Sequence, residues 1–165
     1  MQKSDNSWRL ISHLSFPSGS SVNDFIHEDF RRVKCSSFDK VVEMIWSLGR
    51  SATIGIRQAF RLLIINPADF DLMSIKFCDM YYVDKCLPFG CASSRQLCEP
   101  FSSFLHRLVQ YTSGIETLDH YLDDFIFAWS ESNNNCKILM DTFMNISSKL
   151  GVPIAEKKLY GLQHF

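Results

Sequence analysis

The sequence predicts one domain of the α+β class. Patterns typical of strands and of helices follow one another along its 165 residues without regular alternation. No repeat, low-complexity tract or linker divides the chain. With 46% hydrophobic and 21% charged residues, a chain of this length can bury a substantial core. We therefore expect a folded globular domain and neither a disordered nor a fibrous chain.

The N-terminal part of the chain is predicted to contain a strand followed by a helix. Residues 8–16 alternate apolar and polar side chains over much of their length and end at a Pro-Ser-Gly turn, as a strand would. From Ser37 onward, apolar residues recur at helical spacing, and Gly49 follows the last of them. Ser36 and Asp39 have the spacing of a capping box at the start of this helix.

Four further strands are predicted in the middle of the chain. Residues 52–56 and 59–65 are apolar runs that could form a strand–turn–strand unit, and an Asn-Pro pair ends the second run. Residues 72–77 and 81–83 are also rich in β-forming side chains and flank a Cys-Asp-Met turn. A hairpin is the economical interpretation of this second pair.

The second half of the chain adds two predicted helices. Apolar residues lie on one helical face between residues 93 and 111, where Pro100 is expected to kink or interrupt the helix. Residues 138–150 are periodic as well, and Gly151 follows them as a helix-ending residue would. The remainder, through Lys158, is predicted to be a last strand or a loop.

Two adjacent aspartates, Asp123 and Asp124, lie between β-rich arms within residues 118–129. On a straight strand their side chains would point to opposite faces, so only a tight turn lets both approach one cation, and the pair predicts a hairpin tip. Mg²⁺ prefers carboxylate oxygens and usually keeps one or two of them together with substrate phosphates, as in nucleotidyl transfer. On these two residues alone, a polar turn without a metal is the commoner alternative.

Charge and composition limit the classes of function. A net charge of −1 and a pI near 6.5 give no overall signal for a polyanionic partner, although basic residues cluster locally. The six cysteines form no Cys-x-x-Cys pair, so no metal site built on sulfur is predicted. Because no apolar signal core or membrane-spanning run is present, we expect a soluble intracellular protein without a membrane partner.

Several segments resemble reverse transcriptases, in the order in which that family has them. The sequence Tyr-Leu-Asp-Asp at residues 121–124 resembles the Tyr-x-Asp-Asp motif, and Leu-Pro-Phe-Gly at residues 87–90 resembles the Leu-Pro-x-Gly segment before the palm helix. Residues 8–11 and 18–24 resemble a fingers strand and its adjoining turn, and residues 150–157 resemble the end of the palm. The resemblance covers nearly the whole chain and is strongest to tyrosine-recombinase (DIRS-like) retrotransposons.

This resemblance implies a fold and an activity. The fold would be a partial reverse transcriptase domain, with part of the fingers at about residues 1–50 and a palm at about residues 51–165. The palm would be a ferredoxin-like antiparallel sheet with helices on one face, and no thumb or RNase H region is expected within the chain. The implied activity is RNA-directed DNA polymerisation, a nucleotidyltransferase reaction in which deoxynucleoside triphosphates extend a primer on an RNA or DNA template.

The resemblance also implies roles for individual residues. Asp123 and Asp124 would be the catalytic ligands of Mg²⁺ or Mn²⁺. Arg9 and, with a less defined position, Lys3 would contact the triphosphate, and Phe60 would lie under the sugar and exclude a 2′-hydroxyl. The remaining residues implied in nucleotide binding are Phe89, Gly90 and Tyr121. Judged without the resemblance, Arg9 would be an exposed strand charge and Phe60 a core residue.

One position departs from the family pattern. The strand that enters the Ala59-Phe60 unit carries, in reverse transcriptases, an aspartate that binds both metals four residues before the alanine, and here that residue is Gly55. Glycine offers no side-chain oxygen to a two-metal centre. Together with Pro100 inside a predicted helix, this departure predicts a copy that is defective in catalysis.

Two alternatives to a polymerase domain stay open at the level of sequence. The chain could be a non-catalytic remnant that binds nucleic acid through Arg9, Arg61 and Lys157. In that case its affinity for nucleic acid would rise steeply as the salt concentration falls and would not depend on magnesium. It could also be a translated genomic relic without function, for which a broad, non-cooperative thermal transition is expected.

Overall fold

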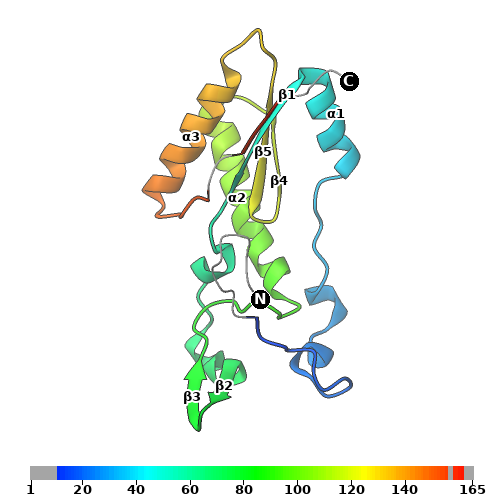
Figure 1. Cartoon of the computed structure of the whole chain (residues 1–165), viewed down its shortest axis with the longest axis vertical. Coiled ribbons are helices and arrows are strands. Elements are labelled where there is room, and N and C mark those ends of the chain that lie inside the picture. The colour runs from blue at the N-terminus through cyan, green and yellow to red at the C-terminus, as the bar shows by residue number, and fades with distance from the viewer. Residues whose placement is uncertain (1–10, 156–157, 162–165) are drawn as a thin grey trace. The chain divides into compact units, whose positions relative to one another are not determined.

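The computed structural model describes residues 11–155 and 158–161 (Figure 1). The chain forms two compact units, each built from two segments. Unit 1 comprises Met1–Val33 and Ala59–Cys98, and unit 2 comprises Lys34–Gln58 and Glu99–Phe165. Within the described residues, no helix is both long and apolar enough to cross a membrane.

Unit 2 is built on a four-stranded antiparallel sheet with the strand order β4-β5-β1-β6. Its strands are β1 (Arg50–Gly55), β4 (Leu118–Tyr121), β5 (Asp124–Trp129) and β6 (Lys158–Gly161). β4 and β5 form a hairpin, and β1 brings a segment from much earlier in the chain to the other side of β5. The sheet agrees with the antiparallel palm-like sheet that the resemblance implied.

The core of unit 2 lies on one face of this sheet. Ile54 of β1 pairs with Phe125 of β5, and neither side chain is exposed. The helix α3 (Asn135–Lys149) supplies Phe143, whose ring lies 4.8 Å from that of Phe125 and 5.4 Å from that of Phe127. Because consecutive strand residues point to opposite faces, Asp124 and its partner Gly55 lie on the face opposite to this core.

Phe143 is expected to be a principal contributor to the stability of unit 2. Its side chain is fully buried, so Phe143→Ala should lower the free energy of unfolding by about 3–5 kcal/mol through lost burial and a cavity. Phe38→Ala, at a side chain that is 78% exposed, is the matched control and should change it by about 0.5 kcal/mol or less. Urea unfolding followed by circular dichroism measures both, and equal effects would contradict this placement of the core.

The first helix of unit 2, α1 (Phe38–Leu48), confirms the helix predicted from Ser37. Gly49 ends it in the left-handed conformation with φ 82°, as predicted. The predicted capping box is wrong, because Ser37 is the N-cap residue and makes no side-chain cap hydrogen bond. The Ser36 hydroxyl instead donates to Asp119 Oδ1 at 2.7 Å, so a tertiary contact replaces the local one.

The long helix α2 (Ser94–Ser113) runs without interruption through Pro100. The expected interruption is therefore wrong. A proline inside a helix removes one backbone hydrogen bond and costs about 3 kcal/mol. Here the ring is exposed, while Leu105 and Val109 of the same helix are completely buried, and this packing holds the helix together on the C-terminal side of the proline.

Unit 1 contains the predicted hairpin of β2 (Ser74–Phe77) and β3 (Met80–Val83). Cys78 and Asp79 form its turn with φ of 48° and 60°, and two residues of positive φ suit the right-handed twist of a two-residue hairpin. The rest of the unit is short 3-10 helices and loops. The 3-10 helices are Val22–Phe25, Glu28–Phe30, Ala59–Leu62 and Pro67–Met73.

Within the described residues of unit 1, two predicted strands are not formed. Residues 59–65 begin as a 3-10 helix, and only Ile64 makes an isolated bridge, with Cys86. A short apolar run fits a strand and a buried helical turn equally well, and the positive φ of 55° at Gln58 turns the chain before a strand can continue. The other predicted strand is residues 8–16, of which the structure describes residues 11–16. These residues form hydrogen bonds with loops instead; for example, the Ser12 amide donates to the Phe89 carbonyl.

Candidate functional site

The Asp123-Asp124 pair lies at the tip of the β4–β5 hairpin, as predicted. Tyr121 pairs with Asp124 across the hairpin, so Leu122 and Asp123 form the turn. Leu122 adopts φ 52°, a conformation that costs a branched side chain about 1–2 kcal/mol, and burial of the Leu122 side chain offsets this. The Ile56 amide donates to the Asp123 carbonyl at 2.8 Å, which anchors the tip next to the end of β1.

Gly55 is the cross-strand partner of Asp124. Directly paired residues point to the same face of a sheet, so a side chain at position 55 would lie beside the Asp124 carboxylate. A Cβ atom added at Gly55 would stand 2.8 Å from Asp124 Oδ1 and 3.9 Å from the Asp123 carbonyl oxygen. The tertiary structure thus places position 55 directly beside the hairpin tip.

The candidate residues of unit 2 lie at the hairpin end of the sheet, on the face opposite to Phe125. Asp124 is exposed, and so is its partner Tyr121, which points to the same face. The neighbouring residue of β5, Phe125, faces the core instead. Two carboxylates at this tip can take part in holding a divalent cation, whereas Gly55 contributes no third one, so the donor set fits a two-metal centre only in part.

In unit 1, the structure brings together three other predicted residues. The rings of Phe60 and Phe89 lie 5.1 Å apart at 45°, and both side chains are half-buried. Gly90 follows with φ 104°, and a Cβ atom there would meet the Ser12 carbonyl oxygen at 2.0 Å. Only glycine fits this close approach of two backbone segments. Arg9 and Lys3, the predicted triphosphate contacts, lie outside the described residues.

Asn23 holds the loop that carries Gly90, a role that sequence reasoning missed. Its side-chain amide donates to the Gly90 carbonyl at 2.8 Å and to the Ser15 hydroxyl at 2.8 Å, and its oxygen accepts from the Ala92 amide at 2.9 Å. The residue is buried, so these bonds satisfy a side chain that would otherwise be costly to bury. The only signal in the sequence was the resemblance of the segment around Asn23 to a fingers turn.

A second polar cluster, also missed, lies at the edge strand β4. His106 of α2 and His120 of β4 are joined by a 2.7 Å contact between their Nδ1 atoms, and His120 Nε2 lies 3.0 Å from Glu99 Oε1. Burial lowers the pKa of His106, and the neighbouring His120 lowers the same pKa further. The two histidines lie 14 residues apart on different elements, so no local spacing in the sequence relates them.

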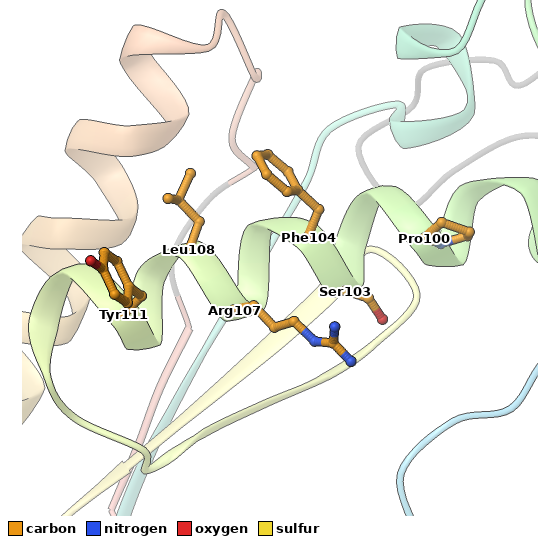
Figure 2. A pocket seen from close by; sticks show the side chains of 6 residues that line it. All are labelled: Pro100, Ser103, Phe104, Arg107, Leu108 and Tyr111. Atoms are coloured by element: carbon orange, nitrogen blue, oxygen red, sulfur yellow. The ribbon is translucent and has the colours of Figure 1, made fainter.

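A shallow pocket runs along one stretch of α2 (Figure 2). All of its lining residues belong to that helix, and none is among the predicted site residues. They are Pro100, Ser103, Phe104, Arg107, Leu108 and Tyr111. The pocket therefore plays no part in the site at the hairpin tip.

Solved structures of foamy virus protease–reverse transcriptases share this fold. One, in complex with double-stranded DNA, has a TM-score of 0.69 at 19% identity over 99% of this chain and 26% of that chain. A mutant of the prototype foamy virus enzyme has a TM-score of 0.69 at 18% identity, over 93% of this chain and 19% of that chain. A third, in complex with an RNA/DNA hybrid, has a TM-score of 0.58 at 17% identity, over 84% of this chain and 18% of that chain.

These likenesses establish the fold, which is α+β and corresponds to part of the palm and fingers of a reverse transcriptase. The chain spans only about a quarter or less of the length of the structures that it resembles. No family model and no curated protein matches the sequence.

Proposed function

We propose that this chain is a reverse transcriptase domain of retrotransposon origin, closest to the DIRS-like elements, and that this copy does not polymerise. The ancestral activity is the template-directed addition of deoxynucleotides to a primer 3′ end. The observation that carries the proposal is the pairing of Gly55 with Asp124. The resemblance implies a metal-binding aspartate at position 55, and glycine has no side-chain oxygen to replace it.

The proposed metal ligands are Asp123 and Asp124, and the proposed ion is Mg²⁺ or Mn²⁺. Such an ion, when bound with substrate phosphates, would neutralise the charge that develops in phosphoryl transfer. In a two-metal centre the carboxylates hold both cations in position next to the attacking and the leaving oxygen. Two carboxylates without a third do not complete that arrangement, so this chain should not position both cations for catalysis.

The proposed partners are an RNA or DNA template with its primer, and deoxynucleoside triphosphates. The similar foamy virus enzymes were solved with double-stranded DNA and with an RNA/DNA hybrid, which supports a nucleic-acid partner. Within unit 1, the adjacent rings of Phe60 and Phe89 and the tight turn at Gly90 are the proposed contacts to the nucleotide. Tyr121, exposed beside Asp124, is the proposed contact in unit 2.

A non-catalytic nucleic-acid-binding remnant is less well supported by the described residues. Arg61, one of the three cations on which that alternative depends, forms an ion pair with Asp84, whose side chain is only 12% exposed. Breaking a partly buried pair to reach a phosphate would leave Asp84 without its partner. The other two cations, Arg9 and Lys157, lie outside the described residues.

Primer extension tests the proposal. A labelled DNA primer on an RNA template, with Mg²⁺ and all four deoxynucleotides, should remain unextended by the native chain, because the carboxylate expected from position 55 is missing. An active reverse transcriptase in parallel shows that the assay works, and cooperative urea unfolding shows that the chain is folded.

The matched control for this assay carries Asp123→Asn and Asp124→Asn. If the native chain extends the primer and the control does not, another acid substitutes at the site and the claim of inactivity is wrong. A broad, non-cooperative unfolding transition of the native chain would instead support the alternative of a genomic relic.

A further inference from the structure

Three potential metal ligands converge at the edge of the sheet in unit 2. His106 comes from α2, and Asp119 and His120 are neighbours on β4. One ligand atom from each lies within 4.8 Å of the other two. Among the described strands, β4 pairs only with β5, so the cluster stands at an edge of the sheet. His106 and Asp119 are only half-buried.

Hydrogen bonds from a second layer of residues orient two of these ligands. His120 Nε2 lies 3.0 Å from Glu99 Oε1, which also accepts from the Ser103 hydroxyl at 3.1 Å. Metal-binding histidines characteristically donate their second ring N–H to such a carboxylate. Asp119 is oriented as well, because its Oδ1 accepts from the Ser36 hydroxyl and from the His120 amide, each at 2.7 Å.

The tautomers of the two rings follow from these contacts. A His120 ring that donates its Nε2–H to Glu99 Oε1 has a lone pair on Nδ1, and this lone pair faces His106 Nδ1. His106 Nδ1, when it carries a proton, donates a hydrogen bond to this lone pair across the 2.7 Å between the two Nδ1 atoms. When His106 carries its proton on Nε2 instead, two lone pairs converge with the Asp119 carboxylate, and a cation can replace the shared proton.

The spacing needs a small adjustment for a metal. Zn–N bonds of about 2.0–2.1 Å in a tetrahedral site put two ligand nitrogens about 3.4 Å apart. The present Nδ1–Nδ1 distance is 2.7 Å, so the rings must separate by less than an ångström. His106 can make this movement, because its ring is only partly buried and sits on the helix side of the contact.

We propose that His106, Asp119 and His120 form a binding site for a transition-metal ion, with Zn²⁺ as the ion that the donor set fits best. Two imidazoles and one carboxylate suit zinc, whereas Mg²⁺ prefers oxygen ligands alone. A fourth position stays open to water. The site is distinct from the Asp123-Asp124 tip and does not depend on the proposed function. A bound ion would tie α2 to β4, the strand that leads into that tip.

Metal titration of the full chain tests this proposal. The metal-free protein is titrated with Co²⁺, whose visible absorption reports coordination geometry, and the Co²⁺ is then displaced with Zn²⁺. One equivalent is expected to bind without a thiolate-to-cobalt band in the near ultraviolet, which distinguishes this site from the six cysteines. Zn²⁺ at 100-fold excess over its Kd should raise Tm by roughly 5–10 °C.

Variants locate the site. His106→Gln should abolish both the cobalt spectrum and the Tm shift, and the isosteric Asp119→Asn should weaken binding at least ~10-fold. His27→Gln, at an exposed histidine of unit 1, is the matched control and should bind as the native chain does. Asp124→Asn should also leave zinc binding unchanged, which separates this site from the tip.

Three results would overturn the proposal. They are a folded native chain that binds no Co²⁺ or Zn²⁺, binding that His106→Gln and Asp119→Asn both leave intact, and a cobalt spectrum dominated by thiolate. Circular dichroism of each metal-free variant shows that the substitutions left the fold in place.

Discussion

Gly55→Asp should increase the affinity of the hairpin tip for Mn²⁺ or Mg²⁺ by about 10–100-fold. The new carboxylate would lie beside Asp124, since a Cβ at this position already approaches Asp124 Oδ1 to 2.8 Å. A carboxylate about 4 Å from a divalent cation contributes several kcal/mol at an effective dielectric constant of 20, and repulsion from Asp124 offsets part of it. Gly55 does not have a positive φ, so its backbone accepts a side chain.

Manganese binding followed by electron paramagnetic resonance measures this effect. Gly55→Asn is the matched control, because it introduces the same Cβ crowding without the charge. Without metal, Gly55→Asp should also lower Tm through the repulsion between neighbouring carboxylates, and the ion should restore it. An equal gain in affinity for the asparagine variant, or none for the aspartate variant, would contradict the proposed position of the missing ligand.

The same substitution should recover part of the lost activity if the rest of the site is intact. Removal of one preorganised electrostatic group commonly lowers the rate of an enzyme by ~10²–10³. Primer extension by Gly55→Asp, absent from Gly55→Asn, would support the proposed ancestry of the site. Tighter metal binding without extension would place a second defect elsewhere in the chain.

Gly90→Ala should destabilise unit 1 more than any other substitution of a glycine by alanine there. The added methyl group would lie 2.0 Å from the Ser12 carbonyl oxygen, and this atom belongs to backbone that cannot rotate away as a side chain can. Gly19→Ala is the matched control, because Gly19 has φ 84° but nothing within 4 Å of the added Cβ. Gly19→Ala should lower the free energy of unfolding by about 1–2 kcal/mol, and Gly90→Ala should lower it by at least ~3 kcal/mol more than that.

Hydrogen exchange measured by mass spectrometry can resolve this effect within the chain. The amides of Ser12 and Asn23 donate to the Phe89 and Leu14 carbonyls, and both should lose protection in Gly90→Ala. Peptides of α3, in unit 2, report on the rest of the chain in the same experiment. Similar protection of Ser12 and Asn23 in the two alanine variants would show that the loop accommodates the methyl group.

Several elements could be predicted from local sequence because local sequence determines them. α1 and α3 follow from apolar residues at helical spacing with glycines after their ends, and the β2–β3 hairpin follows from two β-rich runs around a short turn. The hairpin tip at Asp123 and Asp124 follows from two charged neighbours that a straight strand would separate. Each of these depends on residues close together in the chain.

The elements that were mispredicted depend on contacts between distant segments. Residues 59–65 have the composition of a strand, yet the turn at Gln58 and the packing of unit 1 make their start a 3-10 helix. Pro100 carries a local signal to break α2, and the burial of Leu105 and Val109 overrides it. Ser36 has the right spacing for a cap but donates to Asp119 instead.

The sequence by itself determined the α+β class, most helices and hairpins, the hairpin tip at Asp123 and Asp124, and the absence of an acid at Gly55. Only the tertiary structure decided that Gly55 lies opposite Asp124, because antiparallel pairing joins strands from distant parts of the chain. The contact between His106 and His120 also depends on the tertiary structure. A helix packed on a sheet edge brings together side chains whose spacing in the sequence follows no helical or strand periodicity.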